Sequence, residues 1–553
     1  MTSTSQLCQS NLFEKRSELL SRDARVVLSY ERARAIGLAH GVTLHDILDL
    51  TQKFWDMHID PIVVLDGAAF TLLTIQYNLV VGTLAQYAAT TRPDLISLVE
   101  GILRWDVIGQ FCLTELGRGL DIFRMKTSAT LLPTGEFDLH TPSPSDAKFM
   151  PPTVPVKGLP CVAIVFAQLY VNGECRGPRP FLVNINDGYR MLLPPRGGSA
   201  PVNHALTSFH HVRLPPSALL GDLDKSNRIH RDFMSSIWRV AVGSLAIGSI
   251  AIPSLQISSY IAGRYFQRRH VTSAHGNPVP ILSYRTQQLP LLHAIAQAFV
   301  LRALYKWAIE QFMDKNLDVR VRHGVAACCK AVMVQHAQLA NCALSERMGA
   351  QGLFEYNRLS NLYSEIRGVS IAEGDILGLV ADSLAQTYTL PLSTHPDGPL
   401  ALHEISLFDE ATETVSSSSD FTHAFMQYVQ PHCQLMVESM GHRMAYDAAV
   451  DQGVSQYLVD LYLINAIKTD AAWYVERGIF TRQAIMRMED TALSAALPRL
   501  DELLAAMEVE PYVTAPIISD ECWEKFSRTL PVYSSPQAEA PAQPTLVLER
   551  ARL

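Results

Sequence analysis

The sequence predicts an α+β protein in which a β-rich unit lies between helical units. Residues 1–105 and the chain beyond residue 223 carry apolar residues at three- and four-residue spacing, which is typical of helices. Residues 106–222 instead contain short β-favouring runs separated by turn residues. The length of 553 residues also exceeds what one hydrophobic core organises, so we expect several packed units.

The first unit, residues 1–105, is expected to be helical, with DILDLTQKFWDM and DLISLVEGILRW as its clearest stretches. Both stretches start with Asp, an acid that favours a helix N-terminus. The second unit, residues 106–222, is expected to be a compact β-domain. Its runs CVAIVFAQLYV and RPFLVNI are separated from neighbouring runs by LPTGEF, TPSPSD and LPPRGGSAP.

Two further helical units follow. Residues 223–395 contain LLHAIAQAFVLRALYKWAIEQFM and HGVAACCKAVMVQHAQLANCALSERM, both with long helical periodicity. A polar break, STHPDGPLALHE, precedes the last helical unit, residues 396–530. Residues 531–553 are rich in Pro and Ala and are expected to form a flexible tail.

Composition excludes several classes of protein. A net charge of −8 does not predict nucleic-acid binding, which requires a basic face. Nine scattered cysteines without a CxxC pair indicate a reduced intracellular protein, and the polar start does not match a signal peptide. The longest uncharged run, Val240 to Gly263, is interpreted as a buried helix rather than a membrane span.

The last three residues, Ala551, Arg552 and Leu553, have the small-basic-leucine form of a peroxisomal address. The Pro/Ala tail would present this tripeptide to a receptor. We therefore expect a peroxisomal protein, or a cytoplasmic one if the tripeptide is not read.

Common catalytic motifs are missing. No G-x-G-x-x-G opens a βαβ unit, and no G-x-S-x-G elbow is present. His210 and His211 are adjacent, so on a strand they face opposite sides and cannot share a metal. Aromatic residues such as Trp307 fall on apolar helix faces and are expected in the core.

One carboxylate stands out in GVSIAEGDI, residues 368–376. Glu373 precedes an expected short helix in which Ile376, Leu377, Val380 and Leu384 share a face behind Asp375. A helix N-terminus stabilises the carboxylate anion, whereas apolar burial favours its neutral form. Glu373 is therefore either a structural helix-end residue or a base.

The stretch IGQFCLTELGRG, residues 108–119, resembles the start of the middle β-domain in the acyl-CoA oxidase and acyl-CoA dehydrogenase flavoenzymes. That family has a Thr-Glu-Leu/Met-Gly turn whose threonine and nearby backbone contact the isoalloxazine ring. The resemblance implies that Thr114 and Gly117 belong to a flavin site.

Two more segments are similar to the oxidases. RYFQRRH resembles Arg-Tyr-x-x-x-Arg, and ILSYRTQQ resembles Ile-Leu-x-x-x-Thr-Gln-Gln. The resemblance implies that Arg269 grips the FAD diphosphate, often across a dimer interface, and that Gln287 also binds the cofactor. The planar guanidinium group of an arginine can donate two parallel hydrogen bonds to two phosphate oxygens. The alternative is an arginine-rich, solvated helix end.

MGAQGL is similar to the Gly-Gly-x-Gly-Tyr turn of the oxidases, which implies cofactor contacts at Gly349 and Gly352. The spacing from Lys330 to Asp375 needs no gap and places Glu373 on the catalytic carboxylate of the family. The resemblance covers roughly residues 75 to 390. It implies an N-terminal helical domain, a middle β-barrel domain, a C-terminal four-helix bundle and a second helical domain.

The implied activity is FAD-dependent α,β-dehydrogenation of an acyl-CoA or related thioester. In this family the base removes the proton α to the carbonyl, a β-hydride passes to the flavin, and an oxidase lets dioxygen reoxidise it to give hydrogen peroxide. A homodimer with FAD at its interface is implied as well.

The sequence departs from the family near the expected ring. KFMPPT replaces Lys-Trp-Trp-Pro-Gly-Gly, so Pro152 and Thr153 stand where glycines permit close approach. Ala350, Gln351 and Leu353 also differ from the residues at the matching positions of the oxidase turn. Such drift predicts an altered substrate. Two alternatives remain: a flavin-dependent oxidase or desaturase of a specialised or carrier-bound metabolite, and a non-catalytic relative lacking FAD.

Overall fold

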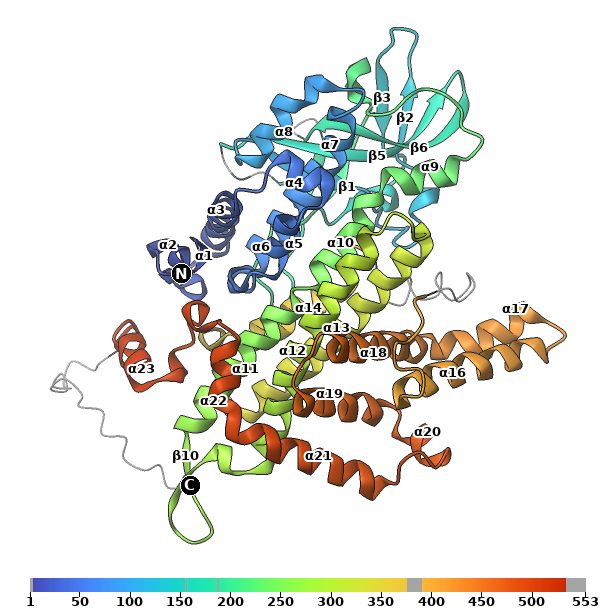
Figure 1. The fold of residues 1–553 in the computed structure, drawn as a ribbon. Coiled ribbons are helices and arrows are strands. Elements are labelled where there is room, and N and C mark those ends of the chain that lie inside the picture. The colour runs from blue at the N-terminus through green and yellow to red at the C-terminus, as the bar shows by residue number, and fades with distance from the viewer. Residues whose placement is uncertain (1–2, 155, 157, 186–187, 375–389, 534–553) are drawn as a thin grey trace.

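The computed structural model of the chain describes residues 3–154, 156, 158–185, 188–374 and 390–533 (Figure 1). Helices, then strands, then two further sets of helices follow one another along the chain. The predicted α+β class with this order of units is confirmed. The tail tripeptide and the short helix expected from Asp375 onward lie outside the described residues, and the boundaries given above for the units stay predictions.

The N-terminal region is helical up to Leu103. Sequence chemistry explains several helix ends: the Ser21 side chain caps the start of α3 by accepting from the Ala24 N–H, and Gly41, with φ of 56°, ends it. The helices are α1 Ser3–Cys8, α2 Asn11–Glu14, α3 Arg22–His40, α4 Leu44–Asp49, α5 Gln52–Ile59, α6 Gly67–Thr74, α7 Gly82–Ala88 and α8 Ile96–Leu103.

A π-helical segment, η3 Ile75–Val81, joins α6 to α7, so that Gly67–Ala88 is one continuous helix. Such segments are uncommon and occur frequently at functional sites. The side chain of Gln76 on η3 accepts from the Gly109 N–H, with Oε1 and N 2.8 Å apart. This bond ties η3 to the first strand of the β-domain.

The β-domain contains a six-stranded sheet in the order β1-β5-β2-β3-β9, with β6 paired to β5, and a three-stranded sheet β4-β8-β7. The long hairpin β5–β6 turns at Asn172-Gly173, both with positive φ, as a two-residue hairpin turn requires. The strands are β1 Ile108–Cys112, β2 Ser128–Leu131, β3 Phe137–His140, β4 Lys148–Phe149, β5 Cys161–Val171, β6 Glu174–Asn184, β7 Tyr189–Leu192, β8 Ala205–Ser208 and β9 Val212–Leu214.

A helical bundle follows, in which α13 packs against each of α10, α11, α12 and α14. A short hairpin of β10 His270–Thr272 and β11 Pro278–Pro280 separates α11 from α12. The helices are α9 Ile229–Ser236, α10 Trp238–Gly248, α11 Ala251–Arg268, α12 Arg285–Met313, α13 Val319–Arg347 and α14 Leu359–Ile371.

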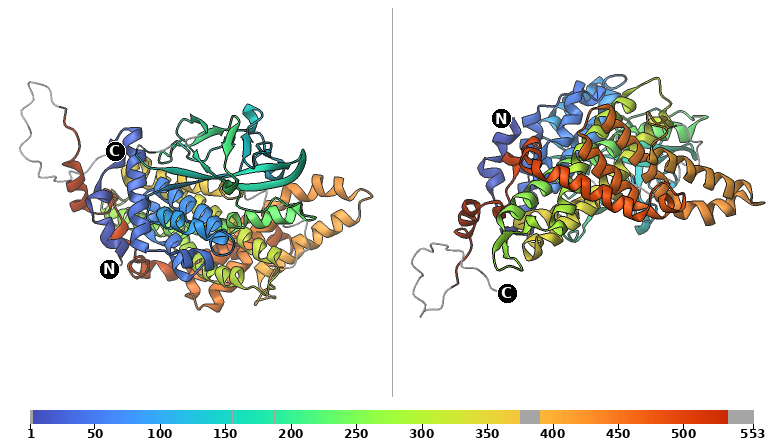
Figure 2. Two further views of the ribbon diagram at one scale, coloured as in Figure 1. Left: turned by 90° about the horizontal axis from the view of Figure 1, so that it is seen from above. Right: turned by 60° about the horizontal axis from the view of Figure 1, so that its bottom comes forward.

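The last region adds a second helical layer on α12 and α13, and its α16–α18 hairpin projects from the body of the molecule (Figures 1 and 2). Near its end the chain returns to the N-terminal helices, where the Tyr512 and Thr4 hydroxyls lie 2.8 Å apart. The helices are α16 Pro399–Ser416, α17 Phe421–Ala424, α18 Cys433–Asp451, α19 Gln456–Thr469, α20 Ala471–Glu476, α21 Arg482–Ala496, α22 Leu500–Ala506 and α23 Asp520–Ser527.

Two helical stretches, Gly67–Ala88 and Trp238–Arg268, are long and apolar enough to cross a membrane by length and composition alone. In each, 89% of the most apolar 18-residue stretch is buried inside the protein. The second contains the uncharged run from Val240, which is a buried helix as predicted.

Candidate active site

Glu373 lies just past the end of α14, in a turn with an unusual backbone. Its φ is 55°, and that of Gly374 is 97°. A left-handed non-glycine residue is strained unless its surroundings hold it. The Ser244 hydroxyl donates to the Glu373 carbonyl at 2.6 Å, and the Lys330 ammonium donates to the carbonyls of Ala372 and Gly374 at 2.5 and 2.6 Å. Three hydrogen bonds therefore fix the turn.

The carboxyl group of Glu373 points into the protein, between α10 and η3. Its Oε2 accepts from the Asn78 amide at 3.4 Å. On the other side it lies against Gly243: a Cβ at that position would stand 1.2 Å from Oε2. The carboxyl group fits here only because residue 243 has no side chain.

Burial controls the charge of this carboxyl group. Desolvation raises the pKa of Glu373 to about 8, while the nearby charges of Lys330 and Arg239 act in the opposite direction. Burial also lowers the pKa of Arg239 to about 9. A carboxyl group whose pKa lies near neutrality can both accept and release a proton at physiological pH, as a general base requires.

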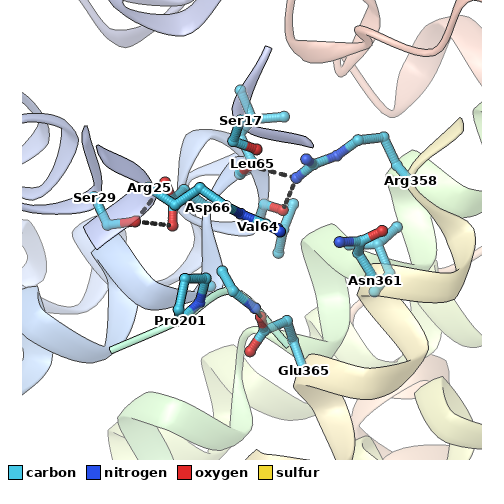
Figure 3. Close-up of a pocket in the computed structure, with 13 residues that line it drawn as sticks. Ser17, Arg25, Ser29, Val64, Leu65, Asp66, Pro201, Arg358, Asn361 and Glu365 are labelled. Carbon is cyan, nitrogen blue, oxygen red and sulfur yellow. Dashed lines mark hydrogen bonds between the residues drawn. The ribbon is translucent and has the colours of Figure 1, made fainter. Parts of the chain in front are cut away.

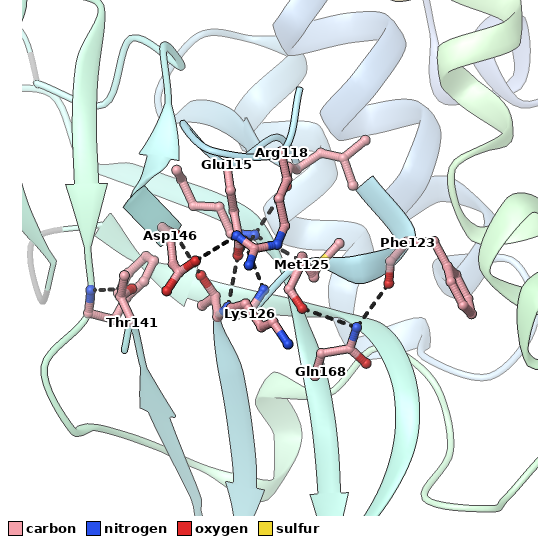
Figure 4. A network of polar contacts seen from close by, with 12 residues as sticks. Glu115, Arg118, Phe123, Met125, Lys126, Thr141, Asp146 and Gln168 are labelled. Carbon is pink, nitrogen blue, oxygen red and sulfur yellow. Dashed lines mark hydrogen bonds and ion pairs between the residues drawn. The ribbon is translucent and has the colours of Figure 1, made fainter. Parts of the chain in front are cut away.

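The turn around Thr114 and Gly117 is held by a buried ion pair. The Glu115 carboxylate and the Lys148 ammonium are 3.3 Å apart, and neither side chain is exposed. Glu115 also accepts from the N–H groups of Lys126 and Thr127, each at 2.8 Å (Figure 4). Since β1 leads directly into this turn and packs against η3, the turn is tied to the helix that carries Asn78.

The two predicted turn residues have different surroundings. The Thr114 carbonyl accepts from the Phe149 N–H at 2.9 Å, while its hydroxyl has no partner among the described residues. The Gly117 N–H donates to the Ser145 carbonyl at 2.7 Å, and a Cβ on Gly117 would lie 3.1 Å from that oxygen. The hydroxyl of Thr114 is thus available to a ligand.

The divergent KFMPPT loop turns its polar groups into the β-domain. Met150 has a φ of 57°, and its carbonyl is hydrogen-bonded to His204 Nδ1 at 2.6 Å. The buried Thr153 hydroxyl pairs with that of Thr207 at 2.6 Å. Pro152 offers no N–H. This loop therefore presents few donors to a ligand.

The remaining predicted cofactor residues lie together at the far end of the bundle. Arg269 is exposed directly after α11, and its guanidinium has no hydrogen bond or ion pair among the described residues, whereas Arg268 pairs with Asp520. Gln287 Oε1 is buried without a hydrogen-bond partner in the described part of the chain. Both side chains have free hydrogen-bonding capacity.

The two predicted glycines follow α13 at the same end, where Arg347 Nε donates to the Thr286 carbonyl next to Gln287. Gly349 has a φ of 62°. Gly352 packs so closely that a Cβ would lie 2.0 Å from the Ser345 carbonyl oxygen. Both positions require glycine, which agrees with a tight turn but does not by itself indicate a ligand.

These two groups of predicted residues are far apart within one chain. Trp238–Arg268 is one continuous helix. Glu373 lies against Gly243 near its start, and Arg269 follows its end. At 1.5 Å per residue the two points are about 38 Å apart. This is much farther than the ribityl chain separates a flavin ring from its diphosphate.

Another carboxyl group, that of Glu365 on α14, is largely buried and has a structural role. Glu365 accepts from the Ala200 N–H at 2.8 Å and so fastens the β-domain loop to α14. It lines a small cavity of about 20 Å³ whose other walls include Asp66 and Arg358 (Figure 3). This volume holds about one water molecule, far too little for a flavin or a thioester.

The sequence predicts Glu373 as a site residue but not the side chains that surround it. Asn78, Arg239, Gly243 and Ser244 carried no local signal, because they come from segments distant in the chain. Lys330 did carry one: it is the single charge in GVAACCKAVMVQHA, and a lone charge in an apolar helical run has to find partners inside the protein.

Comparison with known proteins agrees with this architecture. The family model described as "Acyl-CoA oxidase, C-alpha1 domain" matches residues 243–385. Human peroxisomal acyl-coenzyme A oxidase 3 is 26% identical over 65% of this chain and 56% of its own length. Acyl-coenzyme A oxidase 1 of Drosophila melanogaster is 29% identical over 49% of this chain and 44% of its own. The chain spans about half the length of the curated relatives it matches.

Solved structures match over almost the whole chain. Acyl-CoA oxidase 1 of Yarrowia lipolytica superposes with a TM-score of 0.81 at 16% identity, covering 97% of this chain and 90% of that one. Acyl-CoA oxidase 1 of Arabidopsis thaliana gives 0.78 at 16% identity, with 95% and 91% covered. The fold is thus that of the acyl-CoA oxidases. Within this fold, residues 243–385 match the C-alpha1 domain of the acyl-CoA oxidases.

Proposed function

We propose that the protein is an FAD-dependent, acyl-CoA oxidase-like enzyme. It would catalyse α,β-dehydrogenation of an acyl thioester, with dioxygen reoxidising the flavin to give hydrogen peroxide. The observation that carries the proposal is the Glu373 carboxyl group, which packs against Gly243 and Asn78, with its pKa raised by desolvation to about 8 and its turn held by three hydrogen bonds.

The residues present fit an FAD molecule in most respects. In the described part of the chain, the buried Gln287 Oε1 atom, the Arg269 guanidinium and the Thr114 hydroxyl have no hydrogen-bond partners. These groups would hold the cofactor, Arg269 at the diphosphate. When bound, FAD supplies the hydride acceptor. An acyl-CoA oxidase-1 structure from Caenorhabditis elegans, similar with a TM-score of 0.70 at 17% identity over 96% of this chain and 90% of that one, is described as complexed with FAD and ATP.

Glu373 would act as the base that removes the proton α to the thioester carbonyl. Exclusion of water raises the basicity of its carboxylate, because burial disfavours the charged form. Asn78 holds one carboxyl oxygen, and the Lys330 and Ser244 contacts keep the turn from rotating. Such restraint keeps the base within reach of one carbon atom.

A homodimer is part of the proposal. About 38 Å of helix separates Glu373 from Arg269 in one chain, so the two residues cannot serve the same flavin. A second copy that brings its Arg269 and Gln287 to the Thr114 turn of the first would complete the site. Sedimentation of the flavin-loaded protein tests this, since a monomer that retains FAD would contradict the shared site.

The KFMPPT loop favours a second candidate function with another substrate. Because the Thr153 hydroxyl is committed to Thr207 and Pro152 has no N–H, the ring surroundings differ from those the family motif implies. A flavin-dependent oxidation of a specialised or carrier-bound metabolite is therefore the alternative. Peroxide release from a panel of acyl-CoAs separates the two; a yellow protein that oxidises none of them favours the alternative.

The central test is Glu373→Gln, because an amide of the same size cannot accept the proton. We expect retained flavin and loss of turnover. Glu365→Gln is the matched control: it also neutralises a carboxyl group whose pKa is raised by desolvation, but one on α14 at the contact with the β-domain loop. Full activity of Glu373→Gln would refute the assignment. A colourless protein that cannot be reconstituted with FAD would instead indicate a non-catalytic relative.

Peroxisomal location is proposed from the Ala551-Arg552-Leu553 end and from the peroxisomal names of relatives such as human acyl-coenzyme A oxidase 3. Imaging of the full chain fused at its N-terminus to a fluorescent protein tests it. Removal of the three residues should move the signal from peroxisomes to the cytoplasm.

A further inference from the structure

Lys330 is a buried ammonium group whose charge has no role in the function proposed so far. It lies in the middle of α13 and is fully buried. Its stem crosses Gly248 of α10, where a Cβ would come within 3.2 Å of the Lys330 Cα. Burying an ammonium group costs several kcal/mol unless acceptors surround it, so its partners indicate what the charge is for.

Two of those partners are the carbonyl groups on either side of Glu373. Nζ lies 2.5 Å from the Ala372 oxygen and 2.6 Å from the Gly374 oxygen. The two hydrogen bonds flank Glu373, whose backbone has the left-handed conformation. Lys330 thus holds the backbone that aims the Glu373 side chain.

The charged groups that the structure describes around the Glu373 carboxyl group are both cationic. In the described part of the chain, the charged groups that face its carboxyl are Lys330 from α13 and Arg239 from α10, while η3 contributes the neutral amide of Asn78. The Arg239 guanidinium bonds the carbonyls of Asn78 and Ile47, so its hydrogen bonds hold helices rather than the turn. Of the residues that the structure describes, only Lys330 contacts the turn and also carries a charge.

We propose that Lys330 is the positioning residue of the candidate base: its ammonium group fixes the turn at Glu373 and keeps the carboxyl group available in its ionised form. This inference rests on the proposed function of Glu373. A purely structural role, in which the lysine only satisfies carbonyls at the end of α14, would stabilise the protein without changing the proton affinity of Glu373.

The test compares three single variants. Lys330→Met keeps the apolar stem and removes the charge; Lys330→Gln removes the charge but keeps an N–H donor for the carbonyls, which favours correct folding. Ser244→Ala removes a different contact to the same turn without changing any charge. Each is also made in a Glu373→Gln background, so that the contribution of Glu373 is obtained by difference.

The first measurement uses ligand-free protein. The thermal midpoint is followed from pH 5 to 10, and the part that depends on Glu373 gives its titration. Loss of a nearby opposite charge should move that titration upward by about one pH unit or more in Lys330→Gln and Lys330→Met. Ser244→Ala should leave it near pH 8. Equal titrations in all three variants would overturn the proposal.

The second measurement uses the flavin-loaded enzyme. The acid limb of kcat should move by the same amount, so that kcat at pH 7 falls about tenfold for a one-unit shift. Recovery of kcat at higher pH distinguishes this effect from a damaged site. If the ligand-free titration moves while Glu373→Gln stays fully active, Lys330 tunes the carboxyl group but Glu373 is not the base.

Discussion

Replacing Gly243 with alanine should displace the Glu373 carboxyl group and lower the activity. The new Cβ would stand 1.2 Å from Oε2 of Glu373, and such contacts essentially never fall under 3.0 Å, so the carboxyl group has to move by about 1.8 Å. Misplacement of a catalytic group by about 1 Å can cost about 100-fold in rate. We therefore expect kcat to fall at least about 100-fold.

Stability should change less than activity in Gly243→Ala. Overpacking a well-filled core costs about 1–3 kcal/mol, while exchanging glycine for alanine inside a helix returns about 1 kcal/mol. Urea unfolding should therefore show a loss of about 0–2 kcal/mol. Peroxide release and thioester-dependent bleaching of the flavin measure the activity.

Two variants make the test specific. Gly263→Ala lies on the continuing helix α11, where the new Cβ would meet only the flexible end of Leu504, at 2.8 Å, so kcat should stay close to that of the wild type. The double variant Gly243→Ala/Glu373→Ala removes the clash and should recover the lost stability, a non-additive result. Wild-type kcat in Gly243→Ala would refute the placement of the carboxyl group.

Burial raises the pKa of Glu365 to about 7 and that of Glu373 to about 8, so above pH 4.5 the folded state binds more protons than the unfolded state. The unfolding free energy should therefore fall as the pH rises from 5 to 8. Thermal melts of the Glu365→Gln and Glu373→Gln variants should show a smaller fall. Burial lowers the pKa of His442 to about 4, so its contribution is lost as pH falls from 6.5 towards 4; His442→Gln should weaken this acid sensitivity. Glu115→Gln should cost about 3–5 kcal/mol in urea unfolding because it leaves the Lys148 charge buried and unpaired, and Lys148→Met in the same chain should recover part of this loss.

Much of the fold could be predicted because its signals are local. The spacing of apolar residues distinguishes helices from strands over ten or twenty residues, which is enough to separate the β-domain from the helical regions. The uncharged run from Val240 was correctly interpreted as a buried helix for the same reason. Glu373 was reached through a resemblance in motif spacing, and its location between apolar residues indicated burial.

The sequence by itself determined the order of helical and β units, the resemblance to the acyl-CoA oxidases and the carboxyl residue to examine, since each depends on short motifs of neighbouring residues. Only the tertiary structure decided what surrounds that residue. Asn78, Gly243 and Lys330 meet at Glu373 because α10 packs against both η3 and α13. The tertiary structure also decided that Arg269 lies at the opposite end of the bundle from Glu373, because the helical stretch Trp238–Arg268 separates the two residues.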